Sequence, residues 1–347
     1  MSPYAPVLER TRGTRAESLH YAAAALVDSS GKLLAWIGDP QQDTFLRSSA
    51  KPFQIIPFIE QGYARDLGLL PRQIAQICAS HGGTDMHAEA VRGIQAKIGV
   101  DESFLQCGSH LPLDKESSET LIRRGEQPTP IRHNCSGKHT GMLAFAKARG
   151  LPLDNYLEPA HPIQQDILKT FSEMCQISID KIGIGTDGCS APNFSIPLYN
   201  TALGFARLCD PQELPEKRAD ACKTITSSMM AHPEMVSGFG RFDTRLMQVG
   251  RGKLVAKTGA EGYQAVGILP DLTEASPKGV GIALKISDGD ATGRVREAVM
   301  IEILRQFGIL NNTELAELSE FGPINEIFNW RKIKVGESRP VFKLERA

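Results

Sequence analysis

Strand-like stretches occur near both ends of this chain, and helix-like stretches fill its middle. Residues 19–38 alternate in polarity around the turn "DSSGK", which predicts an antiparallel hairpin. Residues 253–269 and 279–289 carry apolar runs around glycine turns and predict further strands. We therefore expect one mixed or antiparallel sheet assembled from both chain ends, with covering helices and an inserted helical region, an α/β (α+β) fold.

The helices are predicted from apolar spacing and end signals. Residues 48–62 are expected to be helical, beginning near Ser48 or Ser49, because Pro52 suits a first turn. Residues 136–149 are predicted as a helix with Ser136 as N-cap, and further helices are predicted at 162–175, 212–231 and 291–307. We expect a single unit over 1–347, with a sheet subdomain (1–45 and 245–347) and a mainly helical region (46–244).

Composition excludes several classes of function. A net charge of −1 gives no electrostatic attraction to nucleic acid or to an anionic membrane surface. No run approaches the ~18 apolar residues of a membrane span. The first residues lack the apolar block of a secretion signal, so we expect a cytoplasmic protein. Seven cysteines in a reducing compartment are expected to be buried apolar residues, metal ligands or reactive thiols.

Ser48-x-x-Lys51 places a hydroxyl and an amine one helical turn apart. A lysine that is desolvated, or near another cation, can lose its proton and activate a serine. The alternative is a serine that caps a helix and a lysine in solvent. The spacing alone is weak, because it also occurs at Ser29…Lys32 and Ser178…Lys181.

A second element strengthens the catalytic interpretation. Lys257 opens the tripeptide "KTG" on a predicted strand near the C-terminal end. Penicillin-binding proteins and serine β-lactamases pair S-x-x-K on a helix with K-T-G on a strand. Their S-D-N motif is absent here, so the pattern favours the architecture without the lactam chemistry.

Two further segments carry reactive side chains. "HNCSGKHTGML" and "GTDGCSAP" contain Cys135, Lys138 and Cys189; two thiolates would suit zinc, although their spacing matches no zinc finger and buried cysteines are the alternative. "CASHGGTDMH" contains Ser80 and His81, a possible Ser/His pair. No G-x-S-x-G elbow accompanies it, which disfavours an α/β-hydrolase.

Taken in order, "RSSAKP", "CASHGGTDMH", "HNCSGKHTGML", "GTDGC", "HPEMVSGFGRFDT", "KTGAEG" and "KISDG" resemble the Rhizobium etli-type L-asparaginases, the asparaginase II family. The resemblance runs from about residue 15 to near the C-terminus. It implies hydrolysis of L-asparagine to L-aspartate and ammonia, a β-lactamase/glutaminase-like fold, and a homodimer.

The resemblance also implies the site residues. It implies two Ser–Lys tandems, Ser48 with Lys51 and Ser80 with Lys257, with Ser48 as the favoured nucleophile. It implies a zinc ion, not essential for the chemistry, at a site formed by Cys135, Lys138 and Cys189. Substrate contacts are expected from Arg47, His81, Asp187 and Asp243. Asp243 stands where some members carry a third cysteine, which leaves metal binding open.

Two alternatives remain at this point. Another amidase of the same architecture would act on glutamine or a small peptide. A non-catalytic amino-acid-binding protein would have lost at least one of the two serines and two lysines, and all four are present.

Overall fold

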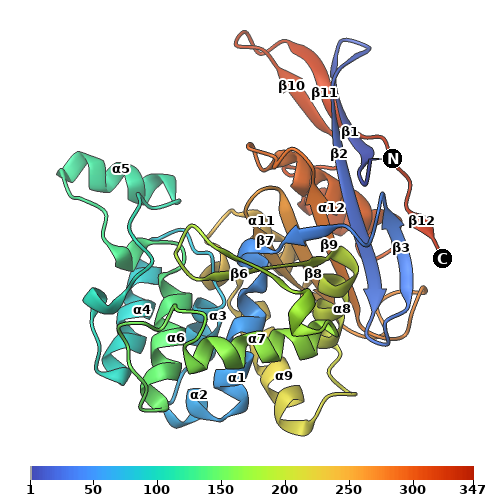
Figure 1. Cartoon of the computed structure of the whole chain (residues 1–347). Helices are drawn as coiled ribbons and strands as arrows, with labels where there is room; N and C mark the ends of the chain where they lie inside the picture. Colours follow the sequence, from blue (N-terminus) through green and yellow to red (C-terminus); the bar gives the residue numbers. More distant parts are fainter. Residues whose placement is uncertain (1) are drawn as a thin grey trace. The chain divides into compact units, whose positions relative to one another are not determined.

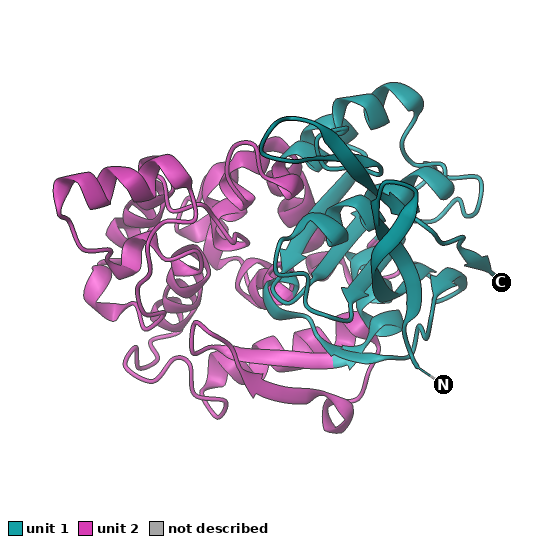
Figure 2. Ribbon diagram, turned by 90° about the horizontal axis from the view of Figure 1, so that it is seen from above, with its two compact units in different colours: residues 1–49, 196–210, 245–347 teal, residues 50–195, 211–244 magenta. Residues whose placement is uncertain are grey.

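The computed structural model describes residues 2–347, whose contacts divide the chain into two compact units (Figure 2). Unit 1 contains residues 1–49, 196–210 and 245–347, and unit 2 contains residues 50–195 and 211–244.

Unit 1 is built on a nine-stranded antiparallel sheet, whose main path runs β10-β11-β1-β2-β9-β8-β7 (Figure 1). Strand β3 pairs with β2 and with β12. Its elements are β1 (Ala5–Arg12), β2 (Arg15–Asp28), β3 (Leu33–Ile37), β4 (Asp43–Phe45), α8 (Leu198–Cys209), β7 (Leu254–Gly259), β8 (Tyr263–Ile268), β9 (Val280–Ile286), α12 (Arg294–Gln306), α13 (Asn312–Glu317), β10 (Asn325–Phe328), β11 (Lys334–Pro340) and β12 (Glu345–Arg346).

The middle of this sheet is covered on both faces. All six residues from Ala22 to Val27 in β2 are fully buried, although consecutive side chains of a strand point to opposite faces. Helix α8 packs on β2, β8 and β9, and α12 contacts β1, β8, β9 and β11. The expected antiparallel sheet from both chain ends, with covering helices, is confirmed; no sequence signal had assigned the central helix α8 to it.

Unit 2 is mainly helical. Helix α1 packs on α7 and α9, α3 on α9 and α6, and α4 on α6. In its core the ring of Phe171 packs edge-to-face with Phe53 and at a tilt against Phe194, at centroid distances of 5.7 and 4.6 Å. Its elements are α1 (Lys51–Glu60), α2 (Tyr63–Asp66), α3 (Pro71–Ile77), α4 (Asp85–Ile98), η2 (Glu102–Phe104), α5 (Lys115–Arg124), η3 (Pro130–Arg132), α6 (Ser136–Ala148), α7 (Pro162–Cys175), η4 (Ile179–Lys181), β5 (Gly183–Thr186), β6 (Pro192–Pro197), α9 (Glu216–Ala231) and α10 (Pro233–Val236).

Helix starts differ from the sequence prediction at two places. Residues Arg47–Ala50 form a 3₁₀ turn (η1), and the α-helix begins only at Lys51 with Ala50 as N-cap. Arg47, at the first position of this turn, has a left-handed backbone (φ 51°), which is uncommon for a residue other than glycine. Helix α6 has Cys135 rather than Ser136 at its N-cap position. The helix at 162–175 begins at Pro162 as predicted.

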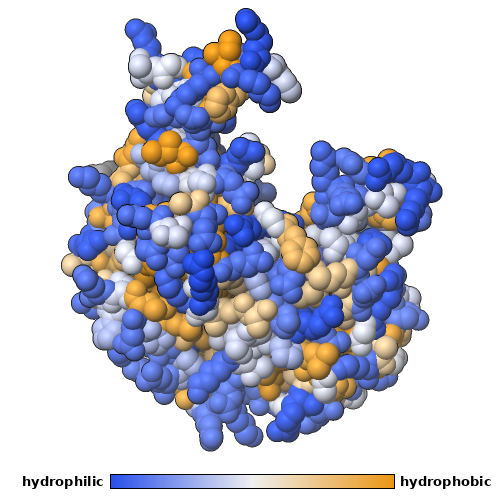
Figure 3. All heavy atoms as spheres, turned by 180° about the vertical axis from the view of Figure 1, so that it is seen from behind, coloured by the Kyte–Doolittle hydropathy of each residue, from blue (hydrophilic) through white to orange (hydrophobic). Residues whose placement is uncertain are grey.

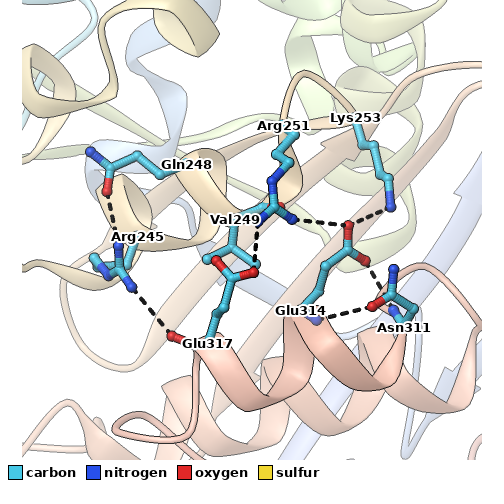
Figure 4. Close-up of polar contacts among 8 residues, drawn as sticks. All are labelled: Arg245, Gln248, Val249, Arg251, Lys253, Asn311, Glu314 and Glu317. Carbon is cyan, nitrogen blue, oxygen red and sulfur yellow. Dashed lines mark hydrogen bonds and ion pairs between the residues drawn. The ribbon is translucent and has the colours of Figure 1, made fainter.

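An ion-pair cluster anchors the start of β7 in unit 1 (Figure 4). The Glu314 carboxylate of α13 accepts from Lys253 Nζ at 2.6 Å and from the Asn311 backbone N–H at 2.9 Å. Burial alone would raise the pKa of Glu314. Those hydrogen bonds and the charges of Lys253 and Arg251 outweigh burial and lower it. The cluster therefore stabilises the turn that leads into the strand of Lys257.

Polar residues dominate the face shown in Figure 3, with smaller apolar areas between them. No helix within residues 2–347 is long and apolar enough to cross a bilayer.

Candidate active site

Lys51 is the centre of the candidate site in unit 2. Its side chain lies at the start of α1 and is 1% exposed, so it is not a solvated lysine. Its Nζ donates to Ala79 O at 2.6 Å, to Ser80 Oγ at 2.8 Å and to Cys135 Sγ at 3.2 Å. Three polar atoms from two other chain segments surround the Lys51 amine. A buried lysine thus links a serine hydroxyl with a thiol.

Ser80 follows helix α3 in a segment held from two sides. Its backbone N–H donates to Val236 O at 2.9 Å, and the N–H of His81 donates to Asn134 O at 3.2 Å. Ser80 is 8% exposed. The hydroxyl therefore projects from a backbone with little freedom, as a positioned catalytic group requires.

The two cysteines predicted to bind metal lie together with Lys138. Cys135 and Cys189 are 3% and 2% exposed and share a hydrogen bond. Lys138 Nζ lies 2.9 Å from Cys189 Sγ. The hydrogen bond from Cys189, with the charges of Lys51 and Lys138, holds the pKa of Cys135 well below its usual value despite burial. The hydrogen bond with Cys135 and burial raise the pKa of Cys189.

Cys135, Cys189 and Lys138 meet some of the requirements of a zinc site. Two adjacent buried sulfurs form a soft donor pair of the kind zinc prefers. The Lys138 amine can join them only without its proton, and the charges of Cys189 and Cys135 raise its pKa against the effect of burial. Over residues 2–347, no group of three His, Cys, Asp or Glu side chains is arranged to hold a metal.

A histidine that the sequence analysis missed lies beside this cluster. His139, one turn after Cys135, is fully buried, and its Nδ1 lies 2.7 Å from Tyr156 Oη. Burial is the main cause that lowers the pKa of His139 to about 4, so its imidazole is neutral. Its spacing from Cys135 in "CSGKH" was the available signal, because residues four apart share a helix face.

Unit 1 carries Ser48 and Lys257 on neighbouring segments. The Ser49 hydroxyl donates to Lys257 O at 2.7 Å, which joins the η1 turn to strand β7. The Lys257 side chain is fully buried, and its Nζ donates to Thr258 O at 2.8 Å. Ser48 is half-buried in η1 and is not the N-cap of α1, so the helix-capping alternative does not apply. The left-handed backbone of Arg47 is the kind of strain that gathers at functional sites.

The remaining predicted residues fall into different surroundings within unit 2. Asp187 is half-buried, and its Oδ2 lies 3.7 Å from Cys189 Sγ. Asp243 is 1% exposed in the first turn of α11 (Phe242–Gly250). His81 is fully buried, with both ring nitrogens hydrogen-bonded. The structure therefore brings Lys51, Ser80, Cys135, Lys138, Cys189 and Asp187 into one part of unit 2.

The family model for L-asparaginase II matches residues 8–340. This chain belongs to the L-asparaginase II family. Membership supports an amidohydrolase activity and agrees with the ordered motifs quoted above. No curated protein gave a significant match.

Two solved structures from Bacillus subtilis show a distant likeness. One is a covalent complex of the glutaminase YbgJ with 5-oxo-L-norleucine, at 14% identity and a TM-score of 0.37, covering 83% of this chain and 89% of that one. The other is a probable glutaminase complexed with 6-diazo-5-oxo-L-norleucine, at 13% identity and a TM-score of 0.35, covering 83% and 84%.

Proposed function

We propose that this protein is an L-asparaginase that hydrolyses L-asparagine to L-aspartate and ammonia through an acyl-enzyme. The observation that carries the proposal is the buried contact of Lys51 Nζ with Ser80 Oγ at 2.8 Å, in a chain of the L-asparaginase II family. A lysine held on a serine by hydrogen bonding is an arrangement that can activate a hydroxyl.

The reaction is an acyl transfer. A serine oxygen attacks the carbon of the side-chain amide while its proton passes to a lysine, which must have given up a proton beforehand. The tetrahedral intermediate collapses, a proton is returned to the leaving nitrogen, and ammonia departs. Water then attacks the ester, and the serine regains its proton as aspartate leaves. Splitting one difficult hydrolysis into two transfers is the advantage of covalent catalysis.

We assign Ser48 as the nucleophile with Lys51 as its base, and Ser80 with Lys257 as the second Ser–Lys tandem. The support for Ser48 is its position three residues before Lys51 in the η1 turn, directly after the left-handed Arg47. Lys257 is the second amine. Arg47 is the proposed cation for the substrate α-carboxylate, with Asp187 and Asp243 as further polar contacts.

The zinc ion is proposed for Cys135, Lys138 and Cys189, with Lys138 deprotonated. Bound there, it would supply a fixed positive charge that organises the thiolates beside Lys51. We expect about one zinc per chain in protein purified without chelator, lost in Cys135→Ala. Folded protein that contains no zinc when purified without chelator would refute the proposed zinc site.

The function is tested by ammonia release from L-asparagine and L-glutamine. We expect faster turnover of asparagine; faster turnover of glutamine would make the protein a glutaminase. Ser48→Ala should abolish turnover, and quenched wild-type reactions should carry an aspartyl ester on the Ser48 peptide. Ser49→Ala is the matched control, because it loses only the bond to Lys257 O and should keep most activity. An ester on the Ser80 peptide would exchange the two serine roles.

Two further proposals have simple tests. The homodimer is checked by light scattering on the eluting protein, and a monomeric mass would refute it. Cytoplasmic location is checked by fractionation of the producing cells.

A further inference from the structure

Two chain segments of unit 2 are joined by two parallel bridges. One segment is Ser80–His81 and the other is Cys135–Ser136. Lys51 forms the first bridge, between Ser80 Oγ and Cys135 Sγ. One residue further along both segments, His81 Nε2 lies 3.0 Å from Ser136 Oγ and forms the second. The hydroxyl and the thiol that Lys51 contacts are thus also held together by a hydrogen bond outside the reacting groups.

The partners of His81 decide its tautomer. The backbone N–H of Gly83 donates to Nδ1 at 3.1 Å, so Nδ1 is an acceptor and Nε2 carries the proton of the neutral ring. Nε2–H then donates to Ser136 Oγ, whose own proton goes to Ile131 O at 2.8 Å. In this series of hydrogen bonds, from Gly83 through His81 and Ser136 to Ile131, each donor meets an acceptor.

His81 is also enclosed on all sides. Its side chain is 0% exposed, and its ring stacks on His87 with centroids 4.9 Å apart at 16°. Burial first, and then the charges of His87, Lys51, His133 and Arg241, lower the pKa of His81 well below its usual value. A ring that is neutral, stacked and bonded at both nitrogens has no donor or acceptor left for a substrate.

We propose that His81 is a positioning residue of the acyl-transfer site: its Nε2–H···Oγ bond to Ser136 holds the Ser80 hydroxyl in reach of Lys51 beside Cys135. This role replaces the substrate contact expected from the sequence, and it rests on the proposed function. Ser136, which the sequence motifs did not indicate as functional, is the acceptor of this positioning hydrogen bond.

A positioning role and a substrate-binding role for His81 predict different effects on kcat and KM. Displacing a reacting group by ~1 Å costs on the order of 100-fold in rate without weakening substrate binding. Loss of the bridge should therefore lower kcat about 10- to 100-fold and change KM by less than about threefold. Loss of a substrate contact would instead raise KM.

The test uses three substitutions in the full-length protein. His81→Leu removes both ring nitrogens, Ser136→Ala removes the acceptor, and His81→Gln restores a donor near the position of Nε2. We expect the first two to lower kcat as above, His81→Gln to recover most of it, and His81→Leu/Ser136→Ala to be no slower than the slower single variant. Such non-additivity identifies one shared interaction.

His161→Leu is the matched control for His81→Leu. His161 is buried in the same unit (4% exposed), and its nitrogens are engaged by the Ile163 N–H at 3.3 Å and by Pro152 O at 3.2 Å. His161→Leu should lose stability as His81→Leu does and leave kcat unchanged. An equal loss of kcat in His161→Leu would show that His81 acts only through general stability, and would overturn the inference.

A spectroscopic readout separates this inference from the proposed function. Nitrogen-15 spectra should show His81 as the neutral Nε2–H tautomer between about pH 5.5 and 8. A Nδ1–H tautomer, or a raised KM with unchanged kcat in His81→Leu, refutes the positioning role in an active enzyme. Wild-type protein that releases ammonia from no amide refutes the proposed function itself.

Discussion

Replacing Lys51 by methionine tests the base at the centre of the proposed mechanism. Methionine keeps the length of the chain and removes the amine that contacts Ala79 O, Ser80 Oγ and Cys135 Sγ. General-base catalysis contributes about 10²- to 10⁴-fold, or about 3 to 5 kcal/mol of transition-state stabilisation. We therefore expect kcat for asparagine to fall at least 100-fold.

The same substitution has a smaller effect on stability. It removes the Lys51 N–H donors from the Ala79 carbonyl and the Ser80 hydroxyl. Each lost hydrogen bond to a buried group lowers the free energy of unfolding by about 1 to 3 kcal/mol. Removal of a buried charge offsets part of this cost. We expect a net loss of about 1 to 4 kcal/mol in the free energy of unfolding, measured by urea denaturation, so the variant should still fold.

Lys51→Arg separates charge from base function. Arginine keeps the positive charge and the hydrogen-bond donors but does not give up a proton in proteins. It should retain more stability than methionine and be as inactive in the ammonia-release assay. Activity above one-tenth of the wild-type level, as an order-of-magnitude threshold, in either variant would refute the assignment of Lys51 as a base.

Two further predictions concern unit 1. Glu314→Gln weakens the bond to Lys253 and should cost about 2 kcal/mol at pH 7. Because the pKa of Glu314 is lowered in the folded state, its stabilisation is present above the unfolded value of 4.5 and is lost as pH falls through the folded value. The free energies of unfolding of wild type and Glu314→Gln, measured in urea, should therefore differ at pH 7 and become equal in acid. An equal difference at pH 7 and in acid would contradict the ion pair. Gly259→Ala should destabilise by about 1 to 3 kcal/mol, because the new Cβ would lie 2.5 Å from Leu46 O. Gly93→Ala in α4 is its control: there the Cβ would meet only the end of a flexible side chain at 3.3 Å, and thermal unfolding should show little change or a small gain.

The chemistry of the candidate site was only partly visible in the sequence. The ordered motifs pointed to Lys51, Ser80 and Cys135, but they paired Lys51 with Ser48 alone. The contacts of Lys51 with Ser80 and Cys135 join residues 29 and 84 positions apart, and no spacing rule reaches that far. His81 was expected to contact substrate; the structure shows it fully buried, with Nε2 3.0 Å from the hydroxyl of Ser136, 55 positions away in the chain.

The sequence by itself indicated the helices α1, α6, α7, α9 and α12, the strands β2, β3, β7, β8 and β9, and a sheet that takes strands from both chain ends. These features follow from apolar periodicity, proline and glycine, which act over a few neighbouring residues. Only the tertiary structure decided that α8 covers the sheet, that residues 47–50 form a 3₁₀ turn before the helix, and that Lys51 lies between the Ser80 hydroxyl and the Cys135 sulfur. Side-chain convergence depends on how whole elements pack, and packing is a property of the folded chain.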